Sequence, residues 1–230
     1  MTVLLNIVNL TLFNTKEKVM PKVSRTPEEV LLVREKILTE AIHYIAQEGW
    51  PGLSMRKLAA KTGMTAANIY NYYGNKDELY LDIQTEGFKR LVHNFREIRN
   101  SSHPAPDQLR EAVKCYIEFG THYPNWYNII FSMDTPKYAD YVGTAIEPTA
   151  YEEKQEGLKL IAITIEIIHD IYDRHSLERD DAPFRAIQLW IELHGLVSLI
   201  NSRVLQEVEG EYHSLTERLM ENFYRSITTP

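Results

Sequence analysis

The stretch Ser54–Lys76, SMRKLAAKTGMTAANIYNYYGNK, decides the fold of this 230-residue chain. Ser54 and Thr65 precede two short apolar-periodic segments, and their hydroxyl groups suit the N-cap position of a helix. Gly63 and Gly74 follow those segments, at positions where a helix commonly ends. The stretch therefore predicts two short helices that meet at Gly63 in the sharp turn of a helix-turn-helix motif.

The second of these helices carries side chains that suit the major groove of DNA. Thr65, Ala66 and Ala67 are short, so the start of the helix can lie deep in the groove. Asn68 can then bind an adenine edge through two hydrogen bonds. Small helical corners whose tyrosines are core show the same spacing, so both interpretations stay open on spacing alone. The candidate phosphate contacts lie near helix N-termini or flanks: Ser54, Arg56, Lys57, Tyr72 and Lys76.

Capping signals extend the helical pattern on both sides of this motif. Thr26-Pro27-Glu28-Glu29 combines a capping box with proline at the first helical position, which predicts the start of a helix. Asn75-Lys76-Asp77-Glu78 predicts the start of a longer helix that ends near Arg99. Residues 161–167 alternate and are rich in β-branched side chains, which is a strand signal. We still expect helix there, because the unbroken segment is about 20 residues long and no partner strand is visible.

Four runs of this sequence resemble the N-terminal domain of the TetR (tetracycline-repressor) family of bacterial transcriptional regulators: Leu53–Ala59, Thr62–Thr65, Ile69–Tyr73 and Asn75–Leu79. The segment Trp190–Gly195 resembles a subgroup of that family with a Trp-x-x-x-His-Gly signature. The resemblance implies two-fold dimers that bind pseudo-palindromic operators with recognition helices about 34–36 Å apart. The residues that it places next to the bases are Ala66, Ala67, Asn68 and Tyr70. Those that it places mainly on phosphates are Ser54, Arg56, Asn71, Tyr72 and Lys76.

The charge of the chain is unevenly distributed. Residues 1–99 hold 14 Lys and Arg against 11 Asp and Glu, a net charge of +3. Residues 100–230 hold 11 against 21, a net charge of −10, within a whole-chain value of −7. This asymmetry indicates different partners for the two parts, because only the first part can approach a polyanion.

The acidic part carries the candidate effector site. Aromatic side chains are dense over residues 116–141, and aromatic walls with a few polar tips suit a flat or apolar small molecule. The same side chains could instead form ordinary core, and His194 could be a structural residue beside Trp190 and a close-approach Gly195. The candidate ligand contacts are Tyr123, Trp126, Tyr127, Phe131, Tyr141, Ile168, Trp190 and His194.

The last two helices are the candidate dimer interface. The segment Phe184–Leu205 is apolar around most of its circumference, which predicts burial on more than one side. The TetR resemblance implies that both helices pair with their mates in a four-helix interface; alternatively, both could be core of their own chain. The candidate interface residues are Leu196, Leu199, Ile200, Leu215, Leu219 and Phe223.

These observations predict an all-α fold, with an N-terminal three-helix helix-turn-helix DNA-binding domain and a larger C-terminal helical domain. The segment 101–106, SSHPAP, is the most linker-like part of the chain and marks the boundary. Residues 1–13 are apolar but too short to span a membrane, and they lack the features of a signal peptide. The expected division is a dispensable extension at 1–19, the DNA-binding domain with its linking helix 76–100 at 20–100, and an effector-binding and dimerisation domain at 107–230.

The sequence favours a regulator over an enzyme. It lacks the G-x-S-x-G, H-E-x-x-H, Walker and dinucleotide glycine motifs, and Cys115 is its only cysteine. The cluster His169, Asp170, Asp173 and His175 fits a solvated helix end better than a metal site. We expect a cytoplasmic repressor without metal or cofactor, a homodimer that binds operator DNA and a small organic effector and contacts no membrane. The alternative is a DNA-binding regulator or architectural protein without an effector.

Overall fold

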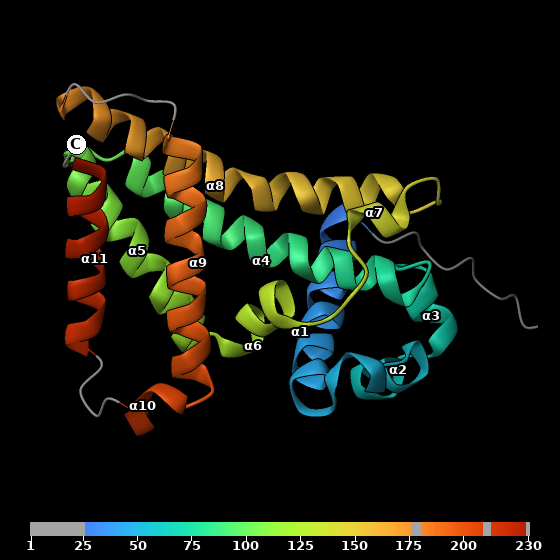
Figure 1. Ribbon diagram of the computed structural model, residues 1–230. Coiled ribbons are helices and arrows are strands. Elements are labelled where there is room, and N and C mark those ends of the chain that lie inside the picture. Colours follow the sequence, from blue (N-terminus) through green and yellow to red (C-terminus); the bar gives the residue numbers. More distant parts are fainter. Residues whose placement is uncertain (1–25, 176–180, 209–212, 229–230) are drawn as a thin grey trace, which may run out of the picture.

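The computed structural model describes residues 26–175, 181–208 and 213–228. Within these residues every regular element is a helix, which confirms the all-α expectation (Figure 1), and residues 161–167 are helical. The elements are α1 (Pro27–Gly52), α2 (Met55–Thr62), α3 (Ala66–Tyr70), α4 (Lys76–Arg99), α5 (Ala105–His122), α6 (Pro124–Tyr127), the π-helix η1 (Asn128–Ser132), α7 (Tyr138–Tyr141), α8 (Glu147–His175), α9 (Ala182–Asn201), α10 (Val204–Val208) and α11 (His213–Thr228).

The first three helices form a small head with its own hydrophobic core. The expected N-caps are present: the Ser54 hydroxyl accepts a hydrogen bond from the Lys57 amide at 3.3 Å, and the Thr65 hydroxyl accepts one from the Asn68 amide at 3.2 Å. Gly63 ends α2 in the left-handed region, with φ of 71°, a conformation that glycine adopts without strain. The caps and this turn therefore set the angle between α2 and α3. The largest fully buried side chains of the head include Ile37, Leu58, Ile69 and Tyr73.

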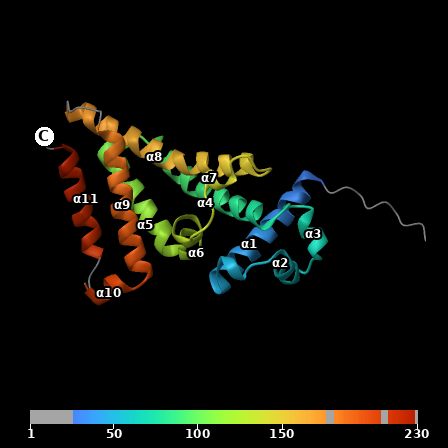
Figure 2. The same cartoon turned by 45° about the vertical axis from the view of Figure 1, so that its right-hand side comes forward.

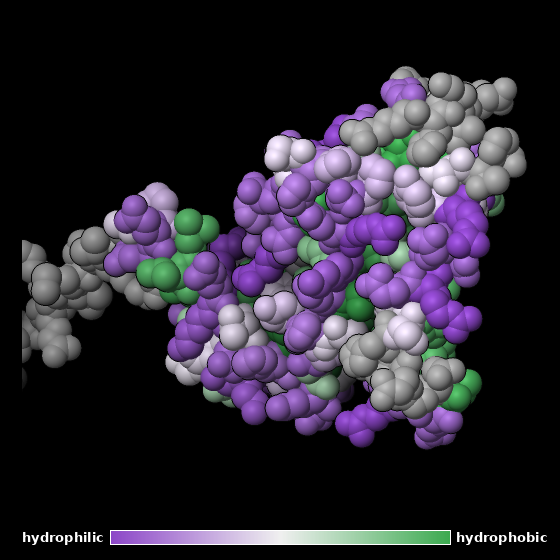
Figure 3. Space-filling model, turned by 90° about the vertical axis from the view of Figure 1, so that its left-hand side faces the viewer, coloured by the Kyte–Doolittle hydropathy of each residue, from purple (hydrophilic) through white to green (hydrophobic). Residues whose placement is uncertain are grey.

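The remaining helices form a larger body, separated from the head in the turned view (Figure 2). Its main core is a cluster to which α4, α5, α8, α9 and α11 contribute most of the side chains. α11 contributes Met220, Phe223 and Ile227 to this cluster. The face of the body on the α11 side is mostly hydrophilic, with hydrophobic side chains in small separate areas (Figure 3).

Helix α4 belongs to both cores. Its first half buries Leu79 and Ile83 in the head, whereas its second half buries Leu91 and Phe95 in the body. The change from one core to the other therefore falls inside α4, before the expected linker at 101–106.

The segment 101–106 forms the turn between α4 and α5 and the first residues of α5, and hydrogen bonds hold it in place. The buried Gln108 amide donates to the carbonyl oxygens of Arg99, Ser101 and His103, at 3.2, 3.3 and 3.1 Å. The Arg99 guanidinium also lies 3.3 Å from the Glu166 carboxylate and 2.9 Å from that of Asp170 on α8. These bonds hold the end of α4 against the body.

Two glycines differ in what surrounds them. A Cβ on Gly120 of α5 would overlap the side chain of Val197 on α9, so the close approach of the two helices at this point depends on glycine. At Gly195, by contrast, no described atom lies within 4 Å of the Cβ position. The expected close approach at Gly195 is therefore wrong within the described chain, and Gly120 fills that role.

We predict that Gly120→Ala destabilises the chain by about 1–3 kcal/mol, because the added methyl group overpacks the α5–α9 contact. Urea unfolding monitored by circular dichroism measures the change. Adding Val197→Ala should restore part of the loss, since it removes the methyl groups that collide with the new one. Strictly additive losses in the double variant would contradict the packing account.

Candidate functional site

The predicted DNA contacts cluster at the outer end of the head, on α2, α3 and the adjoining turns (Figure 1). Tyr70 is 51% exposed and Tyr73 is fully buried, so the tyrosines divide between the surface and the core. The Asn68 side chain is half-buried and makes no hydrogen bond within the described residues. The other exposed members of the predicted set are Arg56, Lys57, Thr65, Ala67 and Asn71, whereas Ser54, Ala66, Tyr72 and Lys76 are half-buried.

Two of the predicted phosphate contacts bond to the end of α1. The Lys76 ammonium donates to the Trp50 carbonyl at 2.6 Å and lies 4.1 Å from the centroid of its indole ring. Burial lowers the pKa of Lys76. The Lys57 ammonium donates to the Gly52 carbonyl at 2.9 Å. Both lysines therefore stabilise the α1–α2 turn, whereas Arg56 is exposed and makes no hydrogen bond within the described residues.

A polar brace that the sequence analysis missed holds the turn after α3. Asp82 on α4 accepts hydrogen bonds from the Arg34 guanidinium at 2.6 Å and from the Tyr73 hydroxyl at 2.7 Å. Burial, followed by the charge of Asp82, raises the pKa of Tyr73. No local pattern reveals this brace, because its members come from α1, α4 and the connecting turn.

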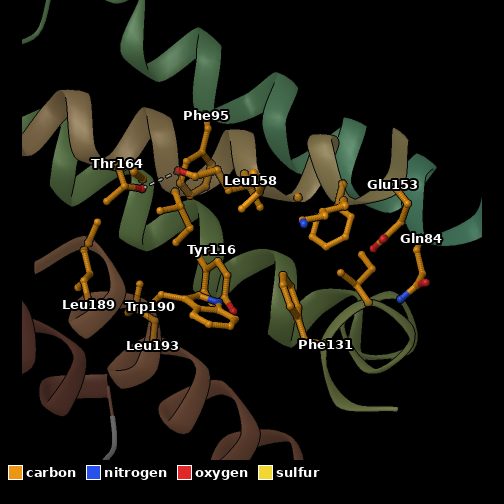
Figure 4. A pocket seen from close by; sticks show the side chains of 18 of the residues that line it. Gln84, Phe95, Tyr116, Phe131, Glu153, Leu158, Thr164, Leu189, Trp190 and Leu193 are labelled. Carbon is orange, nitrogen blue, oxygen red and sulfur yellow. Dashed lines mark hydrogen bonds between the residues drawn. The ribbon is translucent and has the colours of Figure 1, made fainter. Parts of the chain in front are cut away.

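The body contains a cavity of about 600 Å³ (Figure 4). This volume lies in the range of pockets that hold small molecules. Its wall comes from α4, α5, η1, α8 and α9, together with Lys137 and the start of α7. Leu189 and Leu193 lie at one end, and Gln84 and Glu153 lie together at the other end. Between the two ends, the wall includes Tyr116, Phe131 and Trp190.

Of the predicted ligand contacts, Phe131 and Trp190 line this cavity. The other six lie elsewhere. Tyr123 is 58% exposed, and Trp126 packs against both hydrophobic clusters. Tyr127 bonds to His194, Tyr141 packs in a small cluster with Leu81 and Ala150, and Ile168 is fully buried in the core of the body.

The cavity residues that the sequence analysis missed come from distant helices. Tyr116 belongs to the aromatic-rich run, so its residue type was a usable signal. Gln84 and Glu153 look like ordinary polar residues on amphipathic helices, and nothing local distinguishes them. Their role emerges only from the packing of α4 beside α8.

Several polar groups interrupt the apolar wall, among them Glu153, Gln84 and Tyr116. Burial raises the pKa of the half-buried Glu153, although Lys137 opposes this effect. The Gln84 amide donates to the Ile129 carbonyl over 3.4 Å, a long hydrogen bond. The Tyr116 hydroxyl is buried near the Tyr127 hydroxyl and the Trp190 indole, and within the described residues it makes no hydrogen bond of good geometry. Burial also raises the pKa of Tyr116, so its hydroxyl stays protonated and can donate.

The π-helix η1 connects the cavity to the head. Ile129 is 1% exposed and packs in the core of the head, whereas the next two residues, Ile130 and Phe131, line the cavity. The Ile129 carbonyl also accepts a hydrogen bond from the Tyr80 hydroxyl of α4 at 2.6 Å. Short π-helical segments often mark functional sites. A shift of Phe131 would therefore reach the head through a single turn of chain.

The predicted dimer residues differ in exposure. Leu196, Ile200 and Phe223 are buried within their own chain, and the half-buried Leu215 and Leu219 pack beside Leu196 and Ile200. Leu199 is 43% exposed. An outward face of α9 carries three further apolar side chains that the chain itself leaves uncovered: Phe184, Ile187 and Ile191, at 61%, 45% and 61% exposure.

The described residues include neither a group of metal-ligating side chains nor a membrane-spanning helix. No group of three or more His, Cys, Asp and Glu side chains there is arranged to hold a metal ion. Asp170 of the acidic cluster pairs with Arg99, and the His175 side chain lies outside the described residues. In the same part of the chain, no helix has both the length and the apolar character needed to cross a membrane.

Comparison with known proteins gives consistent matches. The family model described as "Bacterial regulatory proteins, tetR family" matches residues 37–83. The model described as "Tetracyclin repressor-like, C-terminal domain" matches residues 109–223. An uncharacterized HTH-type transcriptional regulator of Mycobacterium tuberculosis is 21% identical over 184 residues, which cover 78% of this chain and 75% of that protein.

Two solved structures share the fold. A protein of unknown function from Rhodococcus sp. RHA1 has a TM-score of 0.69 at 17% identity, covering 91% of this chain and all of that one. AibR, solved in complex with isovaleryl coenzyme A and operator DNA, has a TM-score of 0.60 at 19% identity, covering 86% of this chain and 98% of that one.

The Tyr127–His194 contact generates a pH prediction. The Tyr127 hydroxyl lies 2.7 Å from Nδ1 of His194, and burial lowers the pKa of His194 below its ordinary value of 6.5. The unfolded chain therefore binds this proton more readily, so stability is full above about pH 6.5 and falls at lower pH. Between about pH 7.5 and pH 5, the melting temperature of the wild type should fall further than that of His194→Gln, whose side chain does not titrate. Equal falls in both proteins would show that His194 makes no such contribution.

Proposed function

This chain belongs to the tetR family of bacterial regulatory proteins. We propose that it is a repressor whose affinity for operator DNA is controlled by a small organic molecule bound in the cavity of the body. The observation that carries the proposal is the position of η1. Consecutive residues of this π-helix, Ile129 and Ile130, belong to the core of the head and to the cavity wall. A ligand that favours one arrangement of η1 shifts the population of head positions by its difference in affinity for the two arrangements.

In this proposal the head binds DNA through α3. Asn68 and Tyr70 read base edges together with Ala66 and Ala67, and Thr65 lies at the groove entrance. The phosphate contacts are Ser54, Arg56, Lys57, Asn71, Tyr72 and Lys76. The exposure of Tyr70 and the absence of competing hydrogen bonds to Asn68 within the described residues support the first set.

A homodimer would supply the second head for a pseudo-palindromic operator. The exposed apolar face of α9 supports this assembly, because Phe184 and Ile191 are each 61% exposed on one helix face. Leu199 would lie at its margin, while Leu196, Ile200, Leu215, Leu219 and Phe223 would support the interface from within. A two-fold axis beside α9 would pair each face with its own copy.

We extend the proposal to the organisation of the chain. Residues 20–100 bind DNA, and residues 107–230 bind the effector and the partner subunit, whereas the expected extension at 1–19 lies outside the described residues. Trp190 and His194 would belong to the Trp-x-x-x-His-Gly signature of the proposed subgroup, and Trp190 lies on the cavity wall.

The effector is proposed to have an apolar body. Aromatic and aliphatic side chains make up most of the cavity wall, and burial of apolar surface is the main favourable term available to a ligand there. AibR, a structural neighbour, was solved with an acyl coenzyme A. An acyl chain is therefore the first class of ligand body to test.

Selection of DNA from a random pool tests the DNA-binding part of the proposal. We expect a pseudo-palindromic site bound by two copies of the chain. Arg56→Ala should then weaken binding to selected and random DNA alike and lower the salt slope by about one, as expected for a phosphate contact.

On the same DNA, Asn68→Ala should cost about 1–3 kcal/mol and relax the preference at one base pair of each half-site. Fluorescence anisotropy on matched and singly mismatched sites separates the two variants. If Asn68→Ala weakened binding to random DNA as much as to the selected site, Asn68 would not read a base.

The link between cavity and head is tested by Tyr80→Phe. Tyr80 does not line the cavity, but its hydroxyl bonds to the Ile129 carbonyl at 2.6 Å and accepts a hydrogen bond from Thr135 at 3.3 Å. Loss of the hydroxyl should leave ligand affinity for the DNA-free protein within about twofold and reduce the ligand-induced change in operator affinity by roughly fivefold or more. Calorimetry and operator titrations measure the two quantities. An unchanged ligand response would remove the η1–α4 contact from the mechanism.

A further inference from the structure

The polar end of the cavity has a definite chemical preference. Gln84 and Glu153 lie together there, opposite the aliphatic end formed by Leu189 and Leu193 (Figure 4). Within the described residues, the Glu153 carboxylate has no hydrogen bond or ion pair. A half-buried carboxylate without such partners favours any ligand group that donates hydrogen bonds to it.

The neighbouring cations do not cancel this preference. Lys137 and Lys154 also border the cavity, but both side chains are exposed, so solvent screens their charges. The Lys137 ammonium bonds to the Thr135 hydroxyl at 3.3 Å, and the Lys154 ammonium lies 4.6 Å from the centroid of the Tyr138 ring. Of these three charged groups, only Glu153 is half-buried, and its burial raises its pKa while Lys137 opposes the shift.

We propose that the cavity binds an amphiphile whose nitrogen-bearing head, an ammonium or an amide, donates N–H hydrogen bonds to Glu153, and that it rejects a free carboxylate on the same tail. The apolar tail lies toward Leu189 and Leu193. The buried Tyr116 hydroxyl, which makes no hydrogen bond of good geometry within the described residues, faces the middle of the ligand and donates to an acceptor where the ligand has one. This inference rests on the proposed effector site and assigns the chemistry of its polar end.

The proposed preference of the polar end distinguishes ligands that share one acyl chain and differ in their head group. A free fatty acid would bring its carboxylate against Glu153 at neutral pH, and the repulsion between like charges disfavours that complex. An amide of the same acid, or a coenzyme A thioester with amide groups in its arm, offers N–H donors instead. The tail supplies affinity in every case, so the head decides which derivative binds.

Calorimetric titration of the full chain with decylammonium, decanamide and decanoate tests the inference. We expect decylammonium to bind roughly tenfold to a hundredfold tighter than decanoate, as for a hydrogen bond to a charged group, with decanamide between them. In Glu153→Gln, which keeps the shape and removes the charge, the three affinities should fall within about threefold of one another. Thr164→Val at the aliphatic end is the matched control, and it should preserve the wild-type order because the Thr164 hydroxyl already bonds to the Leu160 carbonyl at 2.9 Å.

The outcomes distinguish this inference from the proposed function. Decanoate binding as tightly as decylammonium would overturn the head-group assignment and still leave an effector cavity in place. Equal losses for all three probes in Glu153→Gln would also overturn it, because the carboxylate would then act on the fold alone. If none of the probes bound, the head-group assignment would be wrong. The regulator proposal would then be tested separately, by measuring whether other small molecules release operator DNA.

Discussion

The structure depends on one constraint, which is that α4 runs without interruption through two hydrophobic cores. Leu79 and Ile83 belong to the head, and Leu91 and Phe95 belong to the body, so neither part can rotate about α4 without losing buried contacts. Gly87 lies between these two sets, where a Cβ would overlap Ile130 of η1. The absence of a side chain at that point brings η1 against α4. The cavity wall and the core of the head therefore meet on one stretch of helix.

The buried polar groups at the cavity lower the stability of the folded chain. A buried hydroxyl that makes no hydrogen bond of good geometry, such as that of Tyr116, costs about 1–3 kcal/mol, and a half-buried carboxylate such as Glu153 adds to this. A tightly packed apolar core would avoid both costs. A ligand that satisfies these groups stabilises the folded arrangement that binds it, in proportion to its concentration over its dissociation constant. In the proposed mechanism, the groups that lower the stability of the fold would thus add to the affinity for an effector.

The sequence predicted what is local and failed where packing decides. The caps at Ser54 and Thr65 and the turn at Gly63 are present because each depends on a few neighbouring residues. The aromatic run includes two residues of the cavity wall, Tyr116 and Phe131, but the sequence could not tell which face of α6 and η1 points into the cavity. Phe131 does, whereas Tyr127 turns to His194 and Tyr123 to the surface. Gln84 and Glu153 were out of reach, because the packing of α4 beside α8 brings them together across 69 positions of sequence.

The distribution of charge bears on how such a protein can be controlled. In the described head, the ammonium groups of Lys57 and Lys76 bond to backbone carbonyls, and Lys36 bonds to the Thr62 carbonyl at 2.8 Å. The acidic body adds repulsion from DNA, so the electrostatic contribution to the binding of random DNA by a single head is expected to be small. In the proposed homodimer, tight binding would require two heads at the correct separation, because the second contact gains from effective concentration only when the geometry permits both. A head that bound strongly alone would stay on DNA whatever the spacing, whereas two weakly binding heads would make the proposed response sensitive to a small movement of η1 and α4.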